Sequence, residues 1–153
     1  IFELSYCANT EGAATLSEIH PALMGVCDME VEKVDLARTD SSYCVFDSRG
    51  AEGYHGGGKY YDPVRGHIAG AGLADRAEIT DAQGLFKSKA ELKKHYESLT
   101  NGVSAANTIF YCGSGVTAAQ NVLAMEHAGF TGSKMYVGSW SEWITDPSRE
   151  IAL

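Results

Sequence analysis

The sequence contains no apolar run near the roughly 18–20 residues that a membrane-spanning helix needs. Basic residues are also few: 12 Lys and Arg stand against 20 Asp and Glu, which gives a formal net charge of -8. Because an acidic surface repels phosphate backbones and anionic lipid, neither nucleic acid nor a membrane is an expected partner. The overall charge does not exclude a small local site for an anion.

Cysteine is sparse as well, with only Cys7, Cys27, Cys44 and Cys112 in 153 residues. No two of them form a C-x-x-C pair, which argues against a zinc knuckle or a thioredoxin-type dithiol. Their small number also argues against a disulfide scaffold and favours a reducing compartment, either the cytoplasm or, alternatively, the mitochondrion. No metal ion and no other cofactor is expected.

The length of 153 residues suits one domain, and 44% hydrophobic residues are enough to build a buried core. Residues 1–27 are interpreted as a linker and edge segment, in which residues 2–6 alternate between apolar and polar as in a half-buried strand. Residues 28–153 are interpreted as the folded domain. The sequence starts at Ile1 without a secretory signal pattern or an initiator Met, which suggests a fragment or a processed start.

Strand-like and helix-like segments alternate along this domain. Strands are predicted at 43–47, 108–111 and 135–137, helices at 28–37, from Ser88 on, at 117–128 and from Ser139 on, and a glycine-rich loop at 50–72. Capping boxes are predicted at Ser88 with Glu91 and at Ser139 with Glu142, and Gly129 is predicted to end a helix. The alternation favours an α/β domain with a largely parallel sheet flanked by helices.

The most informative segment is residues 109–117 (IFYCGSGVT), where an apolar strand ends in Cys112, two glycines follow and a helix begins. Ligands bind at the carboxyl ends of parallel strands, which is where Cys112 would lie. The glycines would let backbone N–H groups turn inward around one point, and the helix would add its positive end. Together these features would stabilise a thiolate and make Cys112 a nucleophile.

Three kinds of cysteine chemistry could use such a thiol. A cysteine phosphatase needs an Arg six positions after the cysteine to hold the phosphate dianion, and Ala118 stands there instead. A Cys–His hydrolase needs an imidazole within reach, and the sequence does not say which of the 5 histidines would supply it. Chemistry in which Cys112 attacks another sulfur atom is therefore favoured.

Four segments resemble motifs of the 3-mercaptopyruvate sulfurtransferases, a group within the rhodanese superfamily. They are residues 45–49 (VFDSR), 65–71 (RGHIAGA), 112–118 (CGSGVTA) and 137–143 (VGSWSEW), and they occur in the family's order and spacing. The resemblance covers residues 28–143 and is to the C-terminal, catalytic half of a tandem two-domain enzyme. It implies a rhodanese-like fold and sulfurtransferase activity.

The resemblance also implies a mechanism. Cys112 would take sulfur from 3-mercaptopyruvate as a persulfide, release pyruvate, and pass the sulfur to a thiol acceptor such as thioredoxin, or to cyanide. Ser114 matches a family serine that pairs with a His and an Asp of an N-terminal rhodanese domain, and that domain is expected to be missing from this chain. The residues implied to bind the sulfur through their backbone N–H groups are Gly113, Gly115, Val116 and Thr117.

The loop composition bears on the choice of sulfur donor. Related thiosulfate sulfurtransferases carry basic residues after the cysteine, whereas Gly113 and Ser114 are neutral. Thiosulfate is a dianion that needs cationic partners, while mercaptopyruvate carries a single carboxylate, so the loop favours mercaptopyruvate. A thiosulfate sulfurtransferase and a non-catalytic module that carries a persulfide or binds a partner are the alternatives.

Two departures from the family pattern concern substrate binding. Gly53 stands where the family usually has an arginine, and Ala69 replaces a proline. Arg65 is then the remaining candidate to bind the substrate carboxylate, and its alternative role is that of a solvated loop arginine.

Other polar and aromatic residues are interpreted as structural. Asp47 and Arg49 are expected to form a pair that ties a strand end to a loop, and His67 is expected to fix a turn by donating a hydrogen bond. Trp140 and Trp143 are expected to pack against the core or a neighbouring domain.

Overall fold

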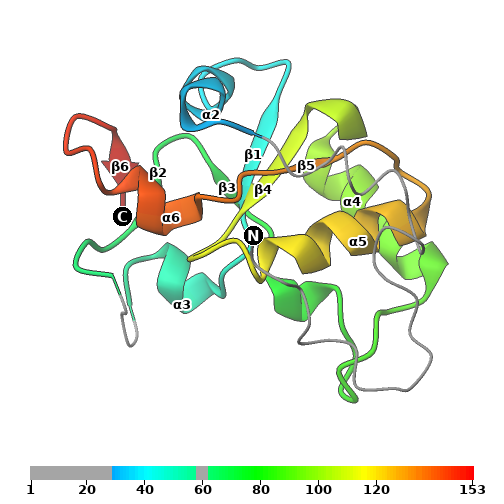
Figure 1. Cartoon of the computed structure of the whole chain (residues 1–153). Helices are drawn as coiled ribbons and strands as arrows, with labels where there is room; N and C mark the ends of the chain where they lie inside the picture. Colours follow the sequence, from blue (N-terminus) through cyan, green and yellow to red (C-terminus); the bar gives the residue numbers. More distant parts are fainter. Residues whose placement is uncertain (1–28, 58–61) are drawn as a thin grey trace, which may run out of the picture.

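A computed structural model describes residues 29–57 and 62–153 (Figure 1). Its main sheet has four strands in the order β3-β1-β4-β5, and every neighbouring pair is parallel. These strands are β1 (Cys44–Asp47), β3 (Gly72–Leu73), β4 (Thr108–Tyr111) and β5 (Lys134–Met135). A second, two-stranded antiparallel sheet pairs β2 (His67–Ile68) with β6 (Ile151–Ala152). The predicted α/β domain with a largely parallel sheet is confirmed.

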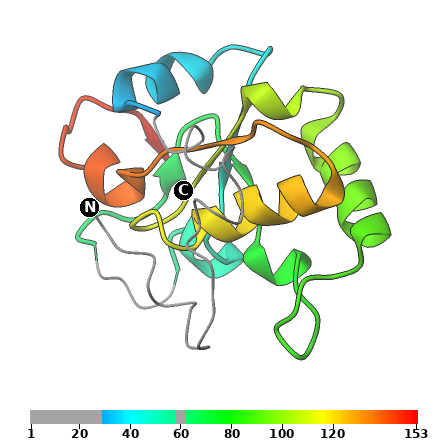
Figure 2. The same ribbon diagram turned by 45° about the vertical axis from the view of Figure 1, so that its right-hand side comes forward.

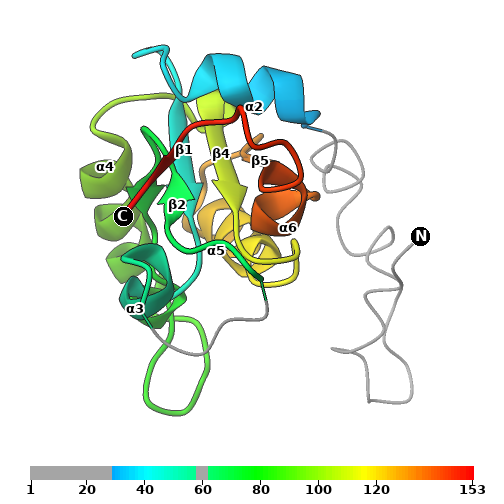
Figure 3. The same ribbon diagram turned by 90° about the vertical axis from the view of Figure 1, so that its left-hand side faces the viewer.

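Alternate side chains of the two central strands point to opposite faces of the sheet, as the period of a strand requires. Phe46 and Phe110 pack with α4 and α5, whereas Val45, Ile109 and Tyr111 pack with α2 and α6. Figures 2 and 3 show these helix pairs covering the two faces. The helices are α2 (Val31–Ala37), α4 (Lys89–Thr100), α5 (Ala118–Ala128) and α6 (Ser139–Trp143). The domain is therefore a three-layer sandwich with a core on each side of the sheet.

The predicted helix signals are largely confirmed. Ser88 and Glu91 form the expected capping box at the start of α4, and α5 ends at Gly129 with φ +98°, the left-handed conformation that glycine adopts readily. In α2, Val31 and Val34 face the core, but Leu36 is 73% exposed and is not part of the apolar face expected for this helix.

The segment predicted as a glycine-rich loop, residues 50–72, holds more regular structure than expected. It contains the short helix α3 (Ala51–Tyr54), β2 and the first residue of β3. Strand β2 is stabilised by pairing with β6 at the far end of the chain, which no local pattern indicates. The structure differs from the sequence-based prediction in two further ways. It contains two short 3₁₀ helices, η3 (Arg76–Glu78) and η4 (Ala105–Asn107), and β5 lies slightly earlier in the chain than predicted.

The strand predicted at residues 2–6 and the linker assigned to residues 1–27 lie outside the described residues. The boundary at residue 27 stays a prediction. None of the helices in the described part of the chain is long and apolar enough to cross a membrane.

Candidate active site

The carboxyl edge of the parallel sheet brings together the segments that the sequence singled out. Cys112 directly follows β4, one of the two central strands, and is only 2% exposed. It is a free thiol, as is the partly buried Cys44. Burial raises the pKa of the Cys44 thiol, so that cysteine is held in its neutral form. Cys112 thus lies at the carboxyl edge of the sheet, the position that its sequence predicted.

The loop of residues 113–117 leads from Cys112 to the first turn of α5. Gly115 adopts φ +87°, and a Cβ there would lie 2.8 Å from the carbonyl oxygen of Val137, so this turn requires glycine. Gly113 differs, because a Cβ there would meet no atom within 4 Å. The expectation that both glycines supply unusual backbone angles therefore holds only for Gly115.

The first turn of α6 binds the backbone of this loop. The backbone N–H of Trp140 donates to the carbonyl of Cys112 at 3.0 Å, and that of Ser141 donates to the carbonyl of Gly113 at 3.0 Å. In a trans peptide the C=O and the next N–H point in opposite directions, and the described residues contain no cis peptide. The N–H groups of Gly113 and Ser114 consequently point away from α6.

The hydrogen bonds of residues 29–57 and 62–153 use none of the backbone N–H groups of residues 113–117 as donors. The side chains of Ser114 and Val116 are exposed around them. Backbone N–H groups are strong donors, so the five without a partner among the described residues are available to water or to an anion beside the buried thiol.

The predicted capping box at Ser139 and Glu142 is wrong. The N-cap of α6 is Gly138, and no side chain caps this helix. The Ser139 hydroxyl instead accepts a hydrogen bond from the backbone N–H of Cys112 at 3.2 Å and donates one to the carbonyl of Tyr136 at 2.9 Å. Ser139 therefore holds the backbone of Cys112, a role that sequence reasoning missed.

The loop after the neighbouring strand β1 is stabilised by an ion pair. Asp47 is fully buried and lies 2.7 Å from the guanidinium of Arg49, which also donates to the carbonyl of Gly66 at 2.7 Å. The same guanidinium stacks over Trp140, 5.0 Å from the ring centroid. The interpretation of Asp47 and Arg49 as a pair that ties a strand end to a loop is confirmed.

The residue before the cysteine is tied to the same ion pair. Burial, and next the Asp47 carboxylate, raise the pKa of Tyr111 well above its usual value, so its hydroxyl stays protonated. That hydroxyl accepts a hydrogen bond from the backbone N–H of Ile68 at 3.0 Å. Tyr111 thus joins β4 to β2 immediately before Cys112.

Asn121 of α5 is a second residue that the sequence analysis did not single out. Its side-chain amide donates to the Ser48 hydroxyl at 3.0 Å and to the Ala74 carbonyl at 2.9 Å, and its amide oxygen accepts from the Tyr96 hydroxyl at 2.9 Å. These bonds join α5 to the ends of β1 and β3 and to α4. In the sequence, the only indication of this role was a single asparagine on the apolar face of the helix.

Arg65, the candidate for binding a substrate carboxylate, is exposed. It follows a segment that is joined to the Cys112 loop: Asp62 lies 3.1 Å from the Ser141 hydroxyl, which donates to the Gly113 carbonyl at 2.8 Å. The indole N–H of Trp140 also donates to the Val64 carbonyl at 3.2 Å. Arg65 therefore extends from a segment fixed beside the site.

The remaining structural interpretations are confirmed. His67 Nδ1 donates to the Tyr54 carbonyl at 2.9 Å, and the imidazole of His67 stacks on the phenol ring of Tyr54 with their centroids 3.7 Å apart. Trp140 and Trp143 are both fully buried in the core between α2, α6 and the sheet.

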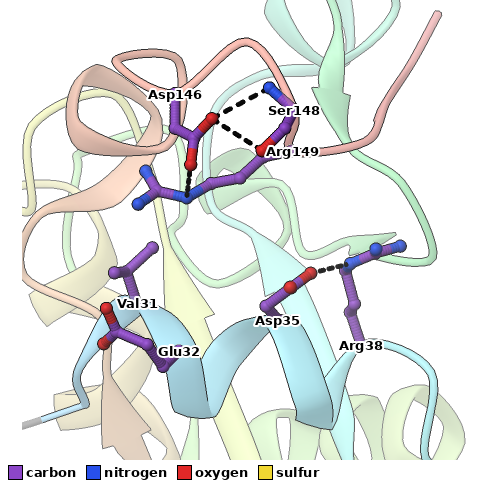
Figure 4. A pocket seen from close by; sticks show the side chains of 7 residues that line it. All are labelled: Val31, Glu32, Asp35, Arg38, Asp146, Ser148 and Arg149. Atoms are coloured by element: carbon purple, nitrogen blue, oxygen red, sulfur yellow. Dashed lines mark hydrogen bonds and ion pairs between the residues drawn. The ribbon is translucent and has the colours of Figure 1, made fainter.

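A cavity of about 210 Å³ lies elsewhere, between α2 and the segment after α6 (Figure 4). Four of its charged side chains form two ion pairs, Arg38 with Asp35 and Arg149 with Asp146. None of the predicted site residues lines it. Within the described residues, no group of three or more His, Cys, Asp or Glu side chains could hold a metal ion.

Comparison with known proteins agrees with this arrangement. Residues 30–146 match the rhodanese-like domain family. The chain belongs to this family. The rhodanese fold and the resemblance inferred from four sequence motifs are thereby confirmed.

Several relatives of this rhodanese domain are named as sulfurtransferases. The chain is 40% identical over 108 residues to a protein of Pseudomonas aeruginosa named "Probable 3-mercaptopyruvate sulfurtransferase", a match that covers 71% of this chain and 38% of that protein. It is 29% identical over 143 residues to thiosulfate/3-mercaptopyruvate sulfurtransferase 2 of Arabidopsis thaliana, covering 88% of this chain and 39% of the relative. The chain thus spans less than two fifths of either relative.

Among solved structures, 3-mercaptopyruvate sulfurtransferase from Leishmania major superimposes with a TM-score of 0.59 at 28% identity. The match covers 67% of this chain and 30% of that structure. The described fold therefore corresponds to a part of that longer structure.

Proposed function

We propose that this rhodanese domain transfers sulfur from 3-mercaptopyruvate through a persulfide on Cys112. The observation that carries the proposal is a 2% exposed cysteine at a strand end, followed by a loop in which five backbone N–H groups have no partner among the described residues. These donors would stabilise both the attacking thiolate and the persulfide anion.

The proposed reaction has two steps. In the first, the Cys112 thiolate attacks the sulfur of 3-mercaptopyruvate, an S–S bond forms and the substrate C–S bond breaks. The bonding electrons pass to the pyruvate enolate, which takes up a proton and leaves as pyruvate. In the second, an acceptor thiolate such as that of thioredoxin attacks the outer sulfur and releases the Cys112 thiolate, or cyanide accepts the sulfur as thiocyanate. No external oxidant, metal or cofactor is needed for this balance.

Ser114 and Arg65 are assigned to the substrate in this proposal. The exposed Ser114 would hydrogen-bond the reacting groups, and the exposed Arg65 would bind the carboxylate of mercaptopyruvate. Gly113, Gly115, Val116 and Thr117 would bind sulfur through their backbone N–H groups.

Thiosulfate is the second candidate donor, because two relatives from Arabidopsis thaliana are named for both substrates. Attack on its outer sulfur would release sulfite and leave the same Cys112 persulfide. The neutral side chains directly after Cys112 favour mercaptopyruvate, since thiosulfate brings two negative charges into the site.

The upstream half of the relatives is a proposed partner of this domain. The exposed Ser114 and Val116 leave the loop open on one side, and water weakens the interactions that hold a reactive anion. A neighbouring rhodanese domain would cover that side and orient Ser114. Without it, the domain could act as a persulfide carrier with slow turnover.

Replacement of the nucleophile tests the proposal. Cys112→Ser should abolish the adduct of about 32 Da that one sulfur atom adds to the protein after incubation with mercaptopyruvate, because oxygen cannot form the S–S bond. Cys44→Ser is the matched control and should gain the adduct like the unmodified chain, since burial keeps the Cys44 thiol neutral. Full adduct on Cys112→Ser would refute the assignment, and mass spectrometry of the peptides would identify the residue modified instead.

A further inference from the structure

Ser139 has an uncommon backbone conformation for its residue type. Its φ is +54°, and only one other non-glycine in the described residues, Asn101, has a positive φ. Asn101 ends α4, where a left-handed residue is usual, whereas Ser139 is the first residue of α6 and is fully buried. A serine held in this conformation is disfavoured relative to glycine, and such outliers gather at functional sites.

The strained conformation directs the Ser139 hydroxyl into the site rather than into α6. The hydroxyl accepts from the Cys112 N–H at 3.2 Å and donates to the Tyr136 carbonyl at 2.9 Å. Glycine would satisfy the backbone here but would provide no hydroxyl. Backbone geometry alone therefore does not account for serine at this position.

We propose that Ser139 is a positioning residue for sulfur transfer, which acts by fixing the backbone of the nucleophile. This inference rests on the proposed function, since it takes Cys112 as the sulfur carrier. Ser139 holds the peptide before Cys112, while Trp140 and Ser141 hold the two peptides after it. Three consecutive peptide planes are thus oriented by one turn of α6, so that the thiol and the free N–H groups of the loop keep one geometry.

Two substitutions separate this role from a purely structural one. Ser139→Ala removes the hydroxyl and keeps the disfavoured φ, whereas Ser139→Gly removes the hydroxyl and relieves the φ. Ser133→Ala is the matched control, because Ser133 is also fully buried but its hydroxyl has no hydrogen-bond partner among the described residues. The maximal rate of persulfide formation, the half-saturating mercaptopyruvate concentration and Tm are measured for each variant.

Both Ser139 variants should form the Cys112 persulfide about five- to tenfold more slowly at saturation, with an unchanged half-saturating concentration, as loss of one hydrogen bond to the backbone of the nucleophile predicts. Their Tm values should differ, with Ser139→Gly the more stable. Ser133→Ala should match the unmodified chain in rate.

The proposal would be overturned if the rate of persulfide formation changed in parallel with Tm. This would be the case if Ser139→Gly reacted as fast as the unmodified chain while Ser139→Ala remained slow. Unmodified rates in both variants would overturn it too. If the unmodified chain itself gains no adduct, the proposed function fails and this inference fails with it, whereas an adduct that is insensitive to Ser139 refutes the inference alone.

Discussion

The loops after the two central strands, β1 and β4, lie side by side but are built in opposite ways. After β1, the buried Asp47 pairs with Arg49 and the Ser48 hydroxyl accepts from Asn121, so the side chains have partners within the protein. After β4, Ser114 and Val116 are exposed and the backbone N–H groups of residues 113–117 bind nothing in the described structure.

This difference separates a structural loop from the one proposed to bind the sulfur donor. A folded protein pairs its polar groups wherever it can, so a loop with satisfied groups has no binding capacity left. The loop after β4 keeps five donors unused next to a buried thiol, and the loop after β1 provides the rigid support beside it. Side-chain substitutions in the loop after β1 should therefore mainly change stability, whereas a substitution at the exposed Ser114, in the loop after β4, should mainly change activity.

The largest expected effect is the loss of stability when the Asp47–Arg49 ion pair is removed. Arg49→Ala leaves the fully buried Asp47 carboxylate without its partner, so the free energy of unfolding should fall by about 3–5 kcal/mol. Urea denaturation measures the change. Lys33→Ala is the control, because Lys33 and its partner Glu30 are 58% and 66% exposed, and it should change stability by less than about 0.5 kcal/mol. Equal effects of the two substitutions would contradict the structural role of Arg49.

The two glycines of the Cys112 loop offer a sharper test. Gly115→Ala should lower the free energy of unfolding by about 2 kcal/mol, because alanine is disfavoured at φ +87° and its Cβ would crowd the Val137 carbonyl. Gly113→Ala should be nearly neutral in stability, since its Cβ meets no atom within 4 Å. Denaturation curves of the two variants measure this difference. A larger loss of unfolding free energy for Gly113→Ala than for Gly115→Ala would show that the loop has a different shape.

The smallest expected effect is on donor selectivity. Ser114→Lys adds a cation beside the incoming donor, and a charge-assisted hydrogen bond to thiosulfate should raise its kcat/KM relative to mercaptopyruvate about tenfold. The ratio should fall again at high ionic strength, because Ser114 is exposed.

Ser98→Lys, which adds the same charge at an exposed position on α4, is the control and should leave the ratio unchanged. If both lysines raise thiosulfate use alike, net charge rather than contact with the donor is responsible. If neither does, Ser114 does not face the substrate.

The sequence by itself determined the local elements and the position of the candidate nucleophile. The alternation of apolar strands and amphipathic helices predicted the α/β domain, and the order of strand, Cys112, glycines and helix predicted the cysteine at the carboxyl edge of the sheet. These features depend on residues close together in the sequence, and such residues produce the periods of 2 and 3.6 that are typical of strands and helices. The four motifs identified the family because each keeps its local residue types in order.

Only the tertiary structure decided which distant groups meet at that edge. The Ser139 hydroxyl reaches the Cys112 N–H across 27 residues, although the local sequence around Ser139 is typical of a helix cap. Asn121 bonds Ser48 across 73 residues, and β2 exists because β6 pairs with it. Hydrogen bonds of this kind depend on how the helices pack on the sheet, and no local periodicity carries that information.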